Sequence, residues 1–147
     1  MESNVVSTVG ALVIKNGTVL LVKHGKSAGH LDGKYGLPAG RIEEGEDIKE
    51  AVYRELKEET GLAADPDSLI LLPGVWFADI ERKSGTEQFS LKVFLVDKVE
   101  GRLSGSAETV PEWINIEDLK KYDLLPNVSD IITEGLKNRG RAIIPWK

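Results

Sequence analysis

Residues 47–60 have the pattern of one amphipathic helix in which glutamates occupy the stripe that should face a core. With Ile48 as reference and about 100° per residue, Glu55 and Glu59 each fall within about 20° of it. Glu58 falls about 80° away, at the margin of the same stripe. A surface helix ordinarily keeps its acids on the opposite face. This placement of three carboxylates therefore needs a physical cause.

Crowding is the first consequence of this spacing, because residues three and four apart are neighbours on a helix. Two carboxylates about 4 Å apart repel by roughly 4 kcal/mol at an effective dielectric of 20, and burial adds a desolvation cost. A divalent cation would remove both costs, and carboxylate oxygens favour Mg²⁺ or Mn²⁺. The alternative is a solvated acidic face, the usual role of a glutamate-rich helix.

The composition indicates one globular domain over residues 1–147, and no repeat or linker divides it. The chain is 41% hydrophobic and carries a net charge of -5, which disfavours binding to a nucleic acid polymer. It contains no cysteine, so disulfides, thiolate metal sites and cysteine nucleophiles are excluded. No apolar run approaches the roughly 20 residues that span a bilayer, so no membrane partner is expected. Residues 1–4 lack the features of a signal peptide, and we expect a cytoplasmic protein.

Strand and helix patterns alternate without a regular βαβ rhythm, so we predict an α+β fold with a mixed sheet. Two apolar runs, 9–14 and 18–22, flank Asn16-Gly17, a strong signal for a type I′ hairpin. Six glycines between 25 and 45 predict a loop. The remaining predicted elements are strands at 69–72, 75–77 and 89–95 and helices near 116–120 and 128–138, the two helices capped by Asn115 and Asn127.

A fixed pattern surrounds the glutamate helix. Gly40, Glu46, Arg54-Glu55, Leu56, Glu58-Glu59, Gly61 and Leu62 spell G-x5-E-x7-R-E-U-x-E-E-x-G-U, where U is aliphatic. This segment, 40–62, resembles the Nudix box, and the chain is similar to Nudix hydrolases of the MutT type. The likeness continues upstream in residues 35–40, where Tyr35 and Ala39 replace the family's commoner Trp and Gly, and downstream in residues 108–119.

The resemblance implies a Nudix fold, an α/β/α sandwich with a mixed sheet and a catalytic loop–helix–loop. It also implies metal-dependent hydrolysis of a diphosphate linkage in a nucleotide-like small molecule, with Mg²⁺ as cofactor and Mn²⁺ as a substitute. A (d)NTP or oxidised dNTP is favoured, because Phe77 stands where a proline would mark ADP-ribose hydrolases. The alternatives are an ADP-sugar or dinucleoside polyphosphate hydrolase and a non-catalytic Nudix binding module. The sequence leaves open whether the protein forms a homodimer.

Roles in the box follow from the resemblance, residue by residue. Glu55 and Glu59 correspond to the principal metal ligands, and Glu58 to a further ligand or the group that activates water. The carbonyl of Gly40 corresponds to an added ligand.

The remaining catalytic candidates lie on either side of the helix. Arg54 and Glu46 resemble the charged pair that orients the carboxylates. Glu108 is the candidate base in a late loop and Glu112 is its alternative. For each of these two acids, the alternative interpretation is an ordinary surface residue without a catalytic role.

Substrate contacts rest on weaker signals. Lys23 could steer an anionic substrate, as could Lys26 and Lys34. Trp113 could stack on a base, and Asn127 stands where some relatives read the base. His24 and His30 match solvated loop histidines more closely than phosphate ligands, and Trp76 and Phe77 match packing residues.

Overall fold

A mixed β-sheet forms the centre of the computed structural model, which describes residues 5–25, 32–82, 85–106 and 108–139. The sheet has the order β10-β2-β1-β8-β6, with β3 paired to β2, β4 to β1 and β7 to β8. Its strands are β1 (Val5–Lys15), β2 (Thr18–His24), β3 (Tyr35–Gly36), β4 (Ala39–Arg41), β6 (Leu69–Leu71), β7 (Trp76–Arg82), β8 (Gly85–Val96) and β10 (Thr109–Asn115). The long strands β1 and β8 run parallel, whereas the other pairs in this sheet are antiparallel. The short strands β5 (Ala63–Ala64) and β9 (Val99–Glu100) pair separately.

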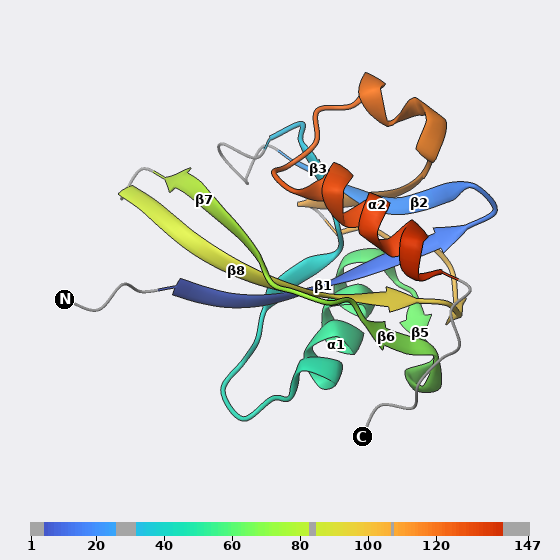
Figure 1. The fold of residues 1–147 in the computed structure, drawn as a ribbon, viewed down its shortest axis with the longest axis horizontal. Coiled ribbons are helices and arrows are strands. Elements are labelled where there is room, and N and C mark those ends of the chain that lie inside the picture. The colour runs from blue at the N-terminus through green and yellow to red at the C-terminus, as the bar shows by residue number, and fades with distance from the viewer. Residues whose placement is uncertain (1–4, 26–31, 83–84, 107, 140–147) are drawn as a thin grey trace.

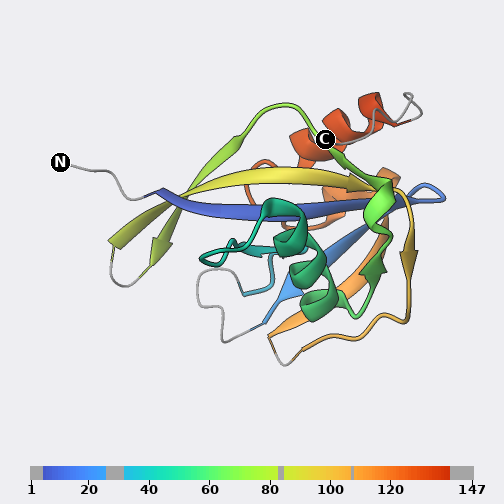
Figure 2. The ribbon, with the colours of Figure 1, turned by 90° about the horizontal axis from the view of Figure 1, so that it is seen from below.

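Helices cover both faces of the sheet. The helix α1 (Ile48–Thr60) lies on one face and α2 (Val128–Asn138) on the other, as Figures 1 and 2 show. Side chains of β1 alternate between them: Val9 and Val13 join the buried cluster on the α1 side, and Leu12 joins the cluster on the α2 side. Short 3₁₀ turns occur at η2 (Pro66–Ser68) and η3 (Ile116–Lys121). The predicted α/β/α sandwich of the α+β class is confirmed.

Two local predictions are confirmed in detail. Asn16 and Gly17 both have positive φ, 51° and 75°, as a type I′ hairpin turn requires. The helix predicted over residues 47–60 is α1, which starts one residue later because Asp47 is its N-cap. Asp47 forms a capping box with Glu50, and the helix ends at Gly61, which has a left-handed φ of 81°. The glutamates of α1 are therefore fixed by a helix with well-defined ends.

Other predictions needed correction. The segment 25–45 is not all loop, because β3 and β4 pair through their backbones with β2 and β1. The predicted strand at 75–77 continues to residue 82, and the one at 89–95 spans 85–96. The strands β5, β9 and β10 were missed. In β10, Pro111 hides the strand pattern, and it is tolerated there because β10 is an edge strand of the sheet.

Asn115 and Asn127 stand at the predicted N-cap positions, but the expected capping hydrogen bond is absent, because neither side chain bonds to its own helix. Asn127 instead has a left-handed φ of 73°, and its Nδ2 donates a hydrogen bond to the carbonyl of Phe77 at 2.8 Å. This long-range contact ties the start of α2 to strand β7.

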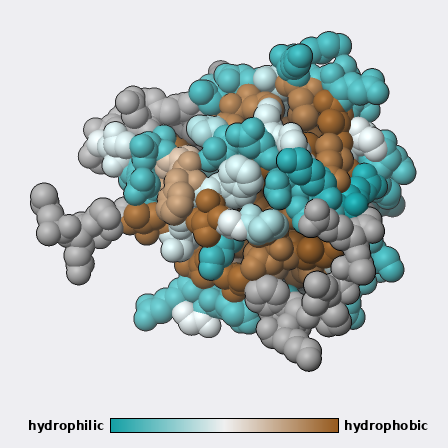
Figure 3. Space-filling model, in the orientation of Figure 1, coloured by the Kyte–Doolittle hydropathy of each residue, from teal (hydrophilic) through white to brown (hydrophobic). Residues whose placement is uncertain are grey.

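Hydrophilic and hydrophobic residues are interspersed on the face that carries α2 (Figure 3). Among the residues that the structure describes, no helix combines the length and apolarity needed to cross a lipid bilayer.

Candidate active site

The glutamates of α1 approach the backbone of β4. The amide of Ala39 donates a hydrogen bond to Glu59 Oε1 at 2.6 Å. At the next residue, a Cβ atom added to Gly40 would overlap the carboxylate of Glu55. Only glycine lets the Glu55 carboxylate lie this close to the chain. Pairing between Gly40 and Val9 holds β4 against β1, so the sheet positions both contacts.

Arg54 connects these carboxylates to the loop before the helix. Its Nε and Nη2 donate to the two oxygens of Glu46 at 2.8 and 2.9 Å. Its Nη1 donates to Glu55 Oε1 at 2.7 Å and to Glu58 Oε2 at 3.3 Å. Nη2 also donates to the carbonyl of Arg41 at 3.0 Å. Such charge-assisted bonds fix side-chain orientation, which is the role expected for Arg54 and Glu46.

The pKa values divide the acids into two groups. Hydrogen bonds from Arg54 lower the pKa of Glu46 to about 2, so Glu46 is a stable anion. Burial raises the pKa of Glu55 against the opposing effect of Arg54. Burial also raises the pKa of Glu59 to about 8, although the Ala39 amide opposes this, and nearby Glu55 adds to it. A buried acid beside other acids is an environment that added positive charge would relieve.

The donor chemistry at this position suits a hard divalent cation. In the part of the chain that the structure describes, no group of three or more His, Cys, Asp or Glu side chains is arranged to hold a metal ion. Glu55 and Glu59 nevertheless flank the same two residues of β4, Ala39 and Gly40. Mg²⁺ characteristically takes one or two protein carboxylates and completes its shell with water and substrate phosphate. Two carboxylates beside a backbone carbonyl fit that requirement.

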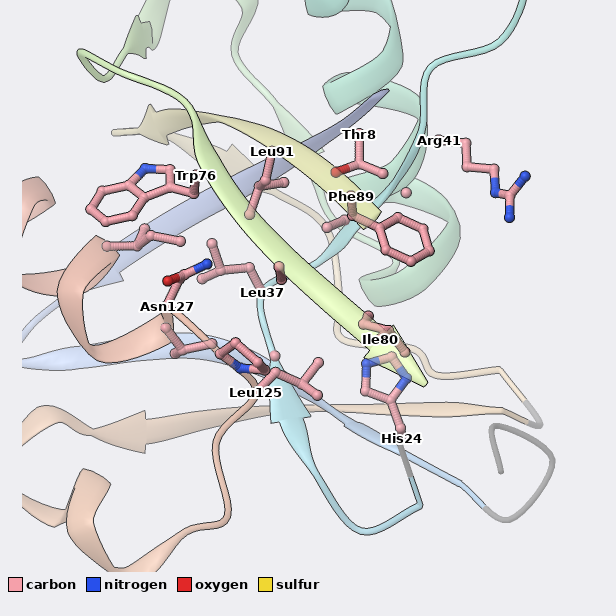
Figure 4. A pocket seen from close by; sticks show the side chains of 17 residues that line it. Thr8, His24, Leu37, Arg41, Trp76, Ile80, Phe89, Leu91, Leu125 and Asn127 are labelled. Carbon is pink, nitrogen blue, oxygen red and sulfur yellow. The ribbon is translucent and has the colours of Figure 1, made fainter. Parts of the chain in front are cut away.

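A cavity of about 280 Å³ opens on the other side of β4. Its walls are mainly apolar and include Leu37, Trp76, Ile80, Phe89, Leu91 and Leu125 (Figure 4). Ala39, Gly40 and Arg41 line it as well. The three residues of β4 therefore form the boundary between the cavity and the glutamates of α1.

Among the described residues, four with polar side chains line this cavity: Thr8, His24, Arg41 and Asn127. Asn127 is held by its hydrogen bond to Phe77, which leaves its Oδ1 as an acceptor. His24 also lines the cavity (Figure 4), and burial lowers its pKa, so the imidazole is neutral at pH 7. The Arg41 side chain points away from the interior (Figure 4), so the polar groups inside the cavity are uncharged.

The structure does not bring every candidate to this cavity. Trp113 packs against the buried cluster on the α1 side and is not among the described lining residues. Lys23 is exposed, with its Nζ 6.0 Å from the ring centroid of Tyr35. Lys26 and His30 lie outside the described residues.

The two late acids occupy different positions. Glu108 is exposed, and its carbonyl accepts a hydrogen bond from the amide of Gly25 at 2.8 Å. Glu112 lies within β10 opposite Leu21, and its charge contributes to the raised pKa of Tyr35, after burial. The described contacts join neither acid to the glutamates of α1.

Sequence reasoning did not single out the apolar walls of the cavity. In the sequence, Trp76 matches a packing residue, His24 matches a solvated residue, and Phe89 and Leu91 fall in the strand predicted at 89–95. The spacing of Phe89 and Leu91 by two positions was the available signal, because it puts both side chains on one face of β8, and that face lines the cavity.

Comparison with known proteins agrees with this architecture. The family model described as NUDIX domain matches residues 5–134. The chain is 30% identical over 151 residues to 8-oxo-dGDP phosphatase NUDT18 of Danio rerio, covering 99% of this chain but only 42% of that protein. It is 33% identical over 120 residues to the oxidized purine nucleoside triphosphate hydrolase of Mus musculus, covering 80% of this chain and 71% of that one.

Among solved structures, the chain resembles the MutT NUDIX hydrolase from Burkholderia pseudomallei. The TM-score is 0.76 at 26% identity, and the match covers 90% of this chain and 98% of that one. Together with the family match over residues 5–134, this likeness assigns the chain to a family. The chain belongs to the Nudix family.

Proposed function

We propose that this chain, as a single domain over residues 1–147, hydrolyses a diphosphate linkage in nucleoside di- or triphosphates. We favour a (d)NTP or an oxidised dNTP as its substrate. The observation that carries the proposal is the double contact of β4: Ala39 and Gly40 touch the glutamates of α1 and also line the cavity. A base in the cavity would leave its phosphates beside the glutamates. The named substrates of the zebrafish and mouse relatives, oxidised purine nucleotides, support this choice.

In this proposal the glutamates of α1 bind the metal ion and activate water. Nudix hydrolases generally use divalent metals, and here Glu55, Glu59 and the Gly40 carbonyl would hold Mg²⁺, or Mn²⁺ in its place, with Glu58 as a further ligand. When bound, the cation supplies positive charge that neutralises the diphosphate and acidifies water. Arg54 fixes Glu55 while Glu46 fixes Arg54.

Glu58 is the proposed proton acceptor for the attacking water. Its side chain is 58% exposed, and it is the least constrained of the three glutamates. It can therefore reach a water molecule that Glu59, buried against Ala39, cannot. Glu108, which lies in the loop directly before β10, is the second candidate for this role.

The size of the cavity favours one base over a larger group. Ligand pockets commonly measure about 300–1,000 Å³, and this cavity lies just below that range. Asn127 Oδ1 would accept a hydrogen bond from an N–H group of the base, since the bond from Nδ2 to Phe77 fixes the amide and leaves Oδ1 available. The second nucleoside of a dinucleoside polyphosphate, or the sugar of an ADP-sugar, would have to bind outside the cavity.

A substrate panel tests the proposal. Purified protein is incubated with Mg²⁺ and 8-oxo-dGTP, dGTP, 8-oxo-dGDP, ADP-ribose or diadenosine polyphosphates, and phosphate and diphosphate release are measured separately. We expect nucleoside monophosphate as the product and the highest kcat/KM among the mononucleotides, with Glu59→Gln as the inactive control. Hydrolysis of ADP-ribose alone would favour the alternative substrate class. Tight binding of nucleotides without any turnover would favour the binding module.

A further inference from the structure

We propose that Ser106 is a positioning residue for Glu108, the second candidate for the proton acceptor. Ser106 acts on the backbone that carries the Glu108 carboxylate and does not itself touch the substrate. This role rests on the proposed function, because it has a purpose only if Glu108 takes part in hydrolysis.

The loop between β9 and β10, which carries both residues, is tied at one point to the end of α1. The amide of Ser104 donates a hydrogen bond to the carbonyl of Thr60 at 2.8 Å, and Thr60 directly follows Glu59. A Cβ atom added to Gly61 would meet the backbone carbonyl of Arg102. The loop therefore packs closely against the end of the helix that carries the glutamates.

At a second point the same loop is tied to the cavity. The carbonyl of Glu108 accepts a hydrogen bond from the amide of Gly25 at 2.8 Å. Gly25 directly follows His24, whose side chain lines the cavity. The next residue of the loop, Thr109, begins β10 and pairs with His24. The backbone of Glu108 is therefore fixed to a wall of the cavity, in a loop that is also fixed to the end of α1.

The hydroxyl of Ser106 organises the turn at Glu108. Ser106 Oγ accepts hydrogen bonds from the amides of Glu108 and Thr109 at 3.2 and 3.1 Å. It also lies 3.0 Å from Thr109 Oγ1, and either hydroxyl can donate in that contact. The Ser106 amide donates to the Thr109 carbonyl at 3.0 Å. A hydroxyl has two acceptor sites and one donor, so its three contacts can use its whole hydrogen-bonding capacity.

The Glu108 carboxylate depends on this turn for its orientation. The side chain is exposed, and within the ranges that the structure describes no hydrogen bond or ion pair holds the carboxylate. Thr109 is only 7% exposed, so it anchors the turn to the sheet. Serine side chains that bond to nearby backbone amides fix turns in this way. Loss of the Ser106 hydroxyl would free the Glu108 backbone and let its carboxylate move away from the site.

Kinetics of Ser106 variants with Mg²⁺ and the mononucleotide of highest kcat/KM test this role. We expect Ser106→Ala to lower kcat about tenfold and to change KM less than about twofold, since displacing a catalytic group by about 1 Å can cost up to about 100-fold. Ser106→Thr keeps the hydroxyl and should stay within about twofold of the wild-type kcat. Ser104→Ala is the matched control: it removes a hydroxyl from the same loop, keeps the amide that bonds to Thr60, and should keep the wild-type kcat.

A double-mutant cycle with Glu108→Gln separates positioning from a general structural effect. In the Glu108→Gln background, Ser106→Ala should change kcat less than about twofold, because the carboxylate that Ser106 positions is gone. Heteronuclear NOE measurements on the amides of Glu108 and Thr109 give a readout that does not depend on activity. We expect lower values in Ser106→Ala, which would show a more mobile turn on the picosecond to nanosecond timescale.

Equal losses of kcat in both backgrounds would overturn the role of Ser106, and so would an unchanged kcat or unchanged NOE values in Ser106→Ala. If Glu108→Gln is as active as the wild type, Glu108 has no role for Ser106 to support, and the inference fails while the proposed function stands. If the wild-type protein hydrolyses none of the mononucleotides, the proposed function itself fails.

Discussion

The carboxylate of Glu55 occupies the space that a Cβ atom on residue 40 would fill. The contact joins α1 to β4. It gives a steric reason for glycine as the first residue of the Nudix box. A side chain at this position would have to push Glu55 away from the backbone that also lines the cavity.

Gly40→Ala should therefore lower kcat/KM by about 100-fold, because a catalytic group displaced by about 1 Å can cost that much. It should also lower the free energy of unfolding by about 1–3 kcal/mol through overpacking. Urea denaturation of Gly40→Ala, Glu55→Ala and the double variant measures the coupling. If the clash with Glu55 is the cause, Gly40→Ala costs clearly less stability in the Glu55→Ala background. Equal costs in both backgrounds would contradict it.

Glu59 should make the metal-free protein less stable at alkaline pH. Its pKa is about 8 in the folded protein, above the ordinary value of 4.5, so its favourable contribution is present below about pH 4.5 and is lost as the pH rises through 8. Glu59→Gln keeps an acceptor for the Ala39 amide but does not titrate. In chelator, the melting temperature of this variant should therefore rise relative to wild type between pH 5 and 8.5. A pH-independent difference would argue against a buried, protonated Glu59.

Glu46 should have the opposite pH dependence. Its pKa of about 2 lies below the ordinary value of 4.5, so the stability it contributes is present above about pH 4.5 and is lost as the pH falls through 2. The stability difference between wild type and Glu46→Gln should be largest near pH 7 and should shrink toward pH 2. Chemical denaturation over this range measures it. Glu44→Gln, at an exposed acid of the same loop, is the control and should show a smaller difference at pH 7.

Glu58 should oppose stability in the metal-free protein and support metal binding. Removing one of three crowded charges relieves repulsion, so Glu58→Gln should be at least as stable as wild type in chelator. Since a ligand of the folded state stabilises it more when it binds more tightly, Mg²⁺ should raise the melting temperature of the variant less than that of wild type. Equal increases in both proteins would place Glu58 outside the metal site.

Measurements of kcat can rank Glu108 and Glu112 as candidates for the catalytic base in the late loop. Glu108 is exposed next to Gly25, at the end of β2 that carries His24, whereas Glu112 lies within β10. We expect Glu108→Gln to lower kcat more than Glu112→Gln does, with KM little changed for both. The reverse order would move the base or additional ligand to Glu112. No effect of either substitution would leave Glu58 as the proton acceptor.

Local interactions explain what the sequence determined by itself. The helix α1, its Asp47 cap, its Gly61 end and the Asn16-Gly17 turn depend on residues within four positions of one another. The spacing of Glu55, Glu58 and Glu59 is equally local, because helical periodicity alone brings them together. The family resemblance then followed from residues 40–62.

Tertiary pairing decided the rest, because the partners are far apart in the chain. The strands β3 and β4 exist through backbone bonds to β2 and β1, which no local pattern in a glycine-rich segment reveals. The side chain of Asn127 bonds to Phe77, 50 positions away, instead of capping its own helix. Trp113 was placed with the α1 cluster by the pairing of β10 with β2. The cavity is assembled from β1, β7, β8 and the start of α2, so its apolar walls are a property of the packed sheet.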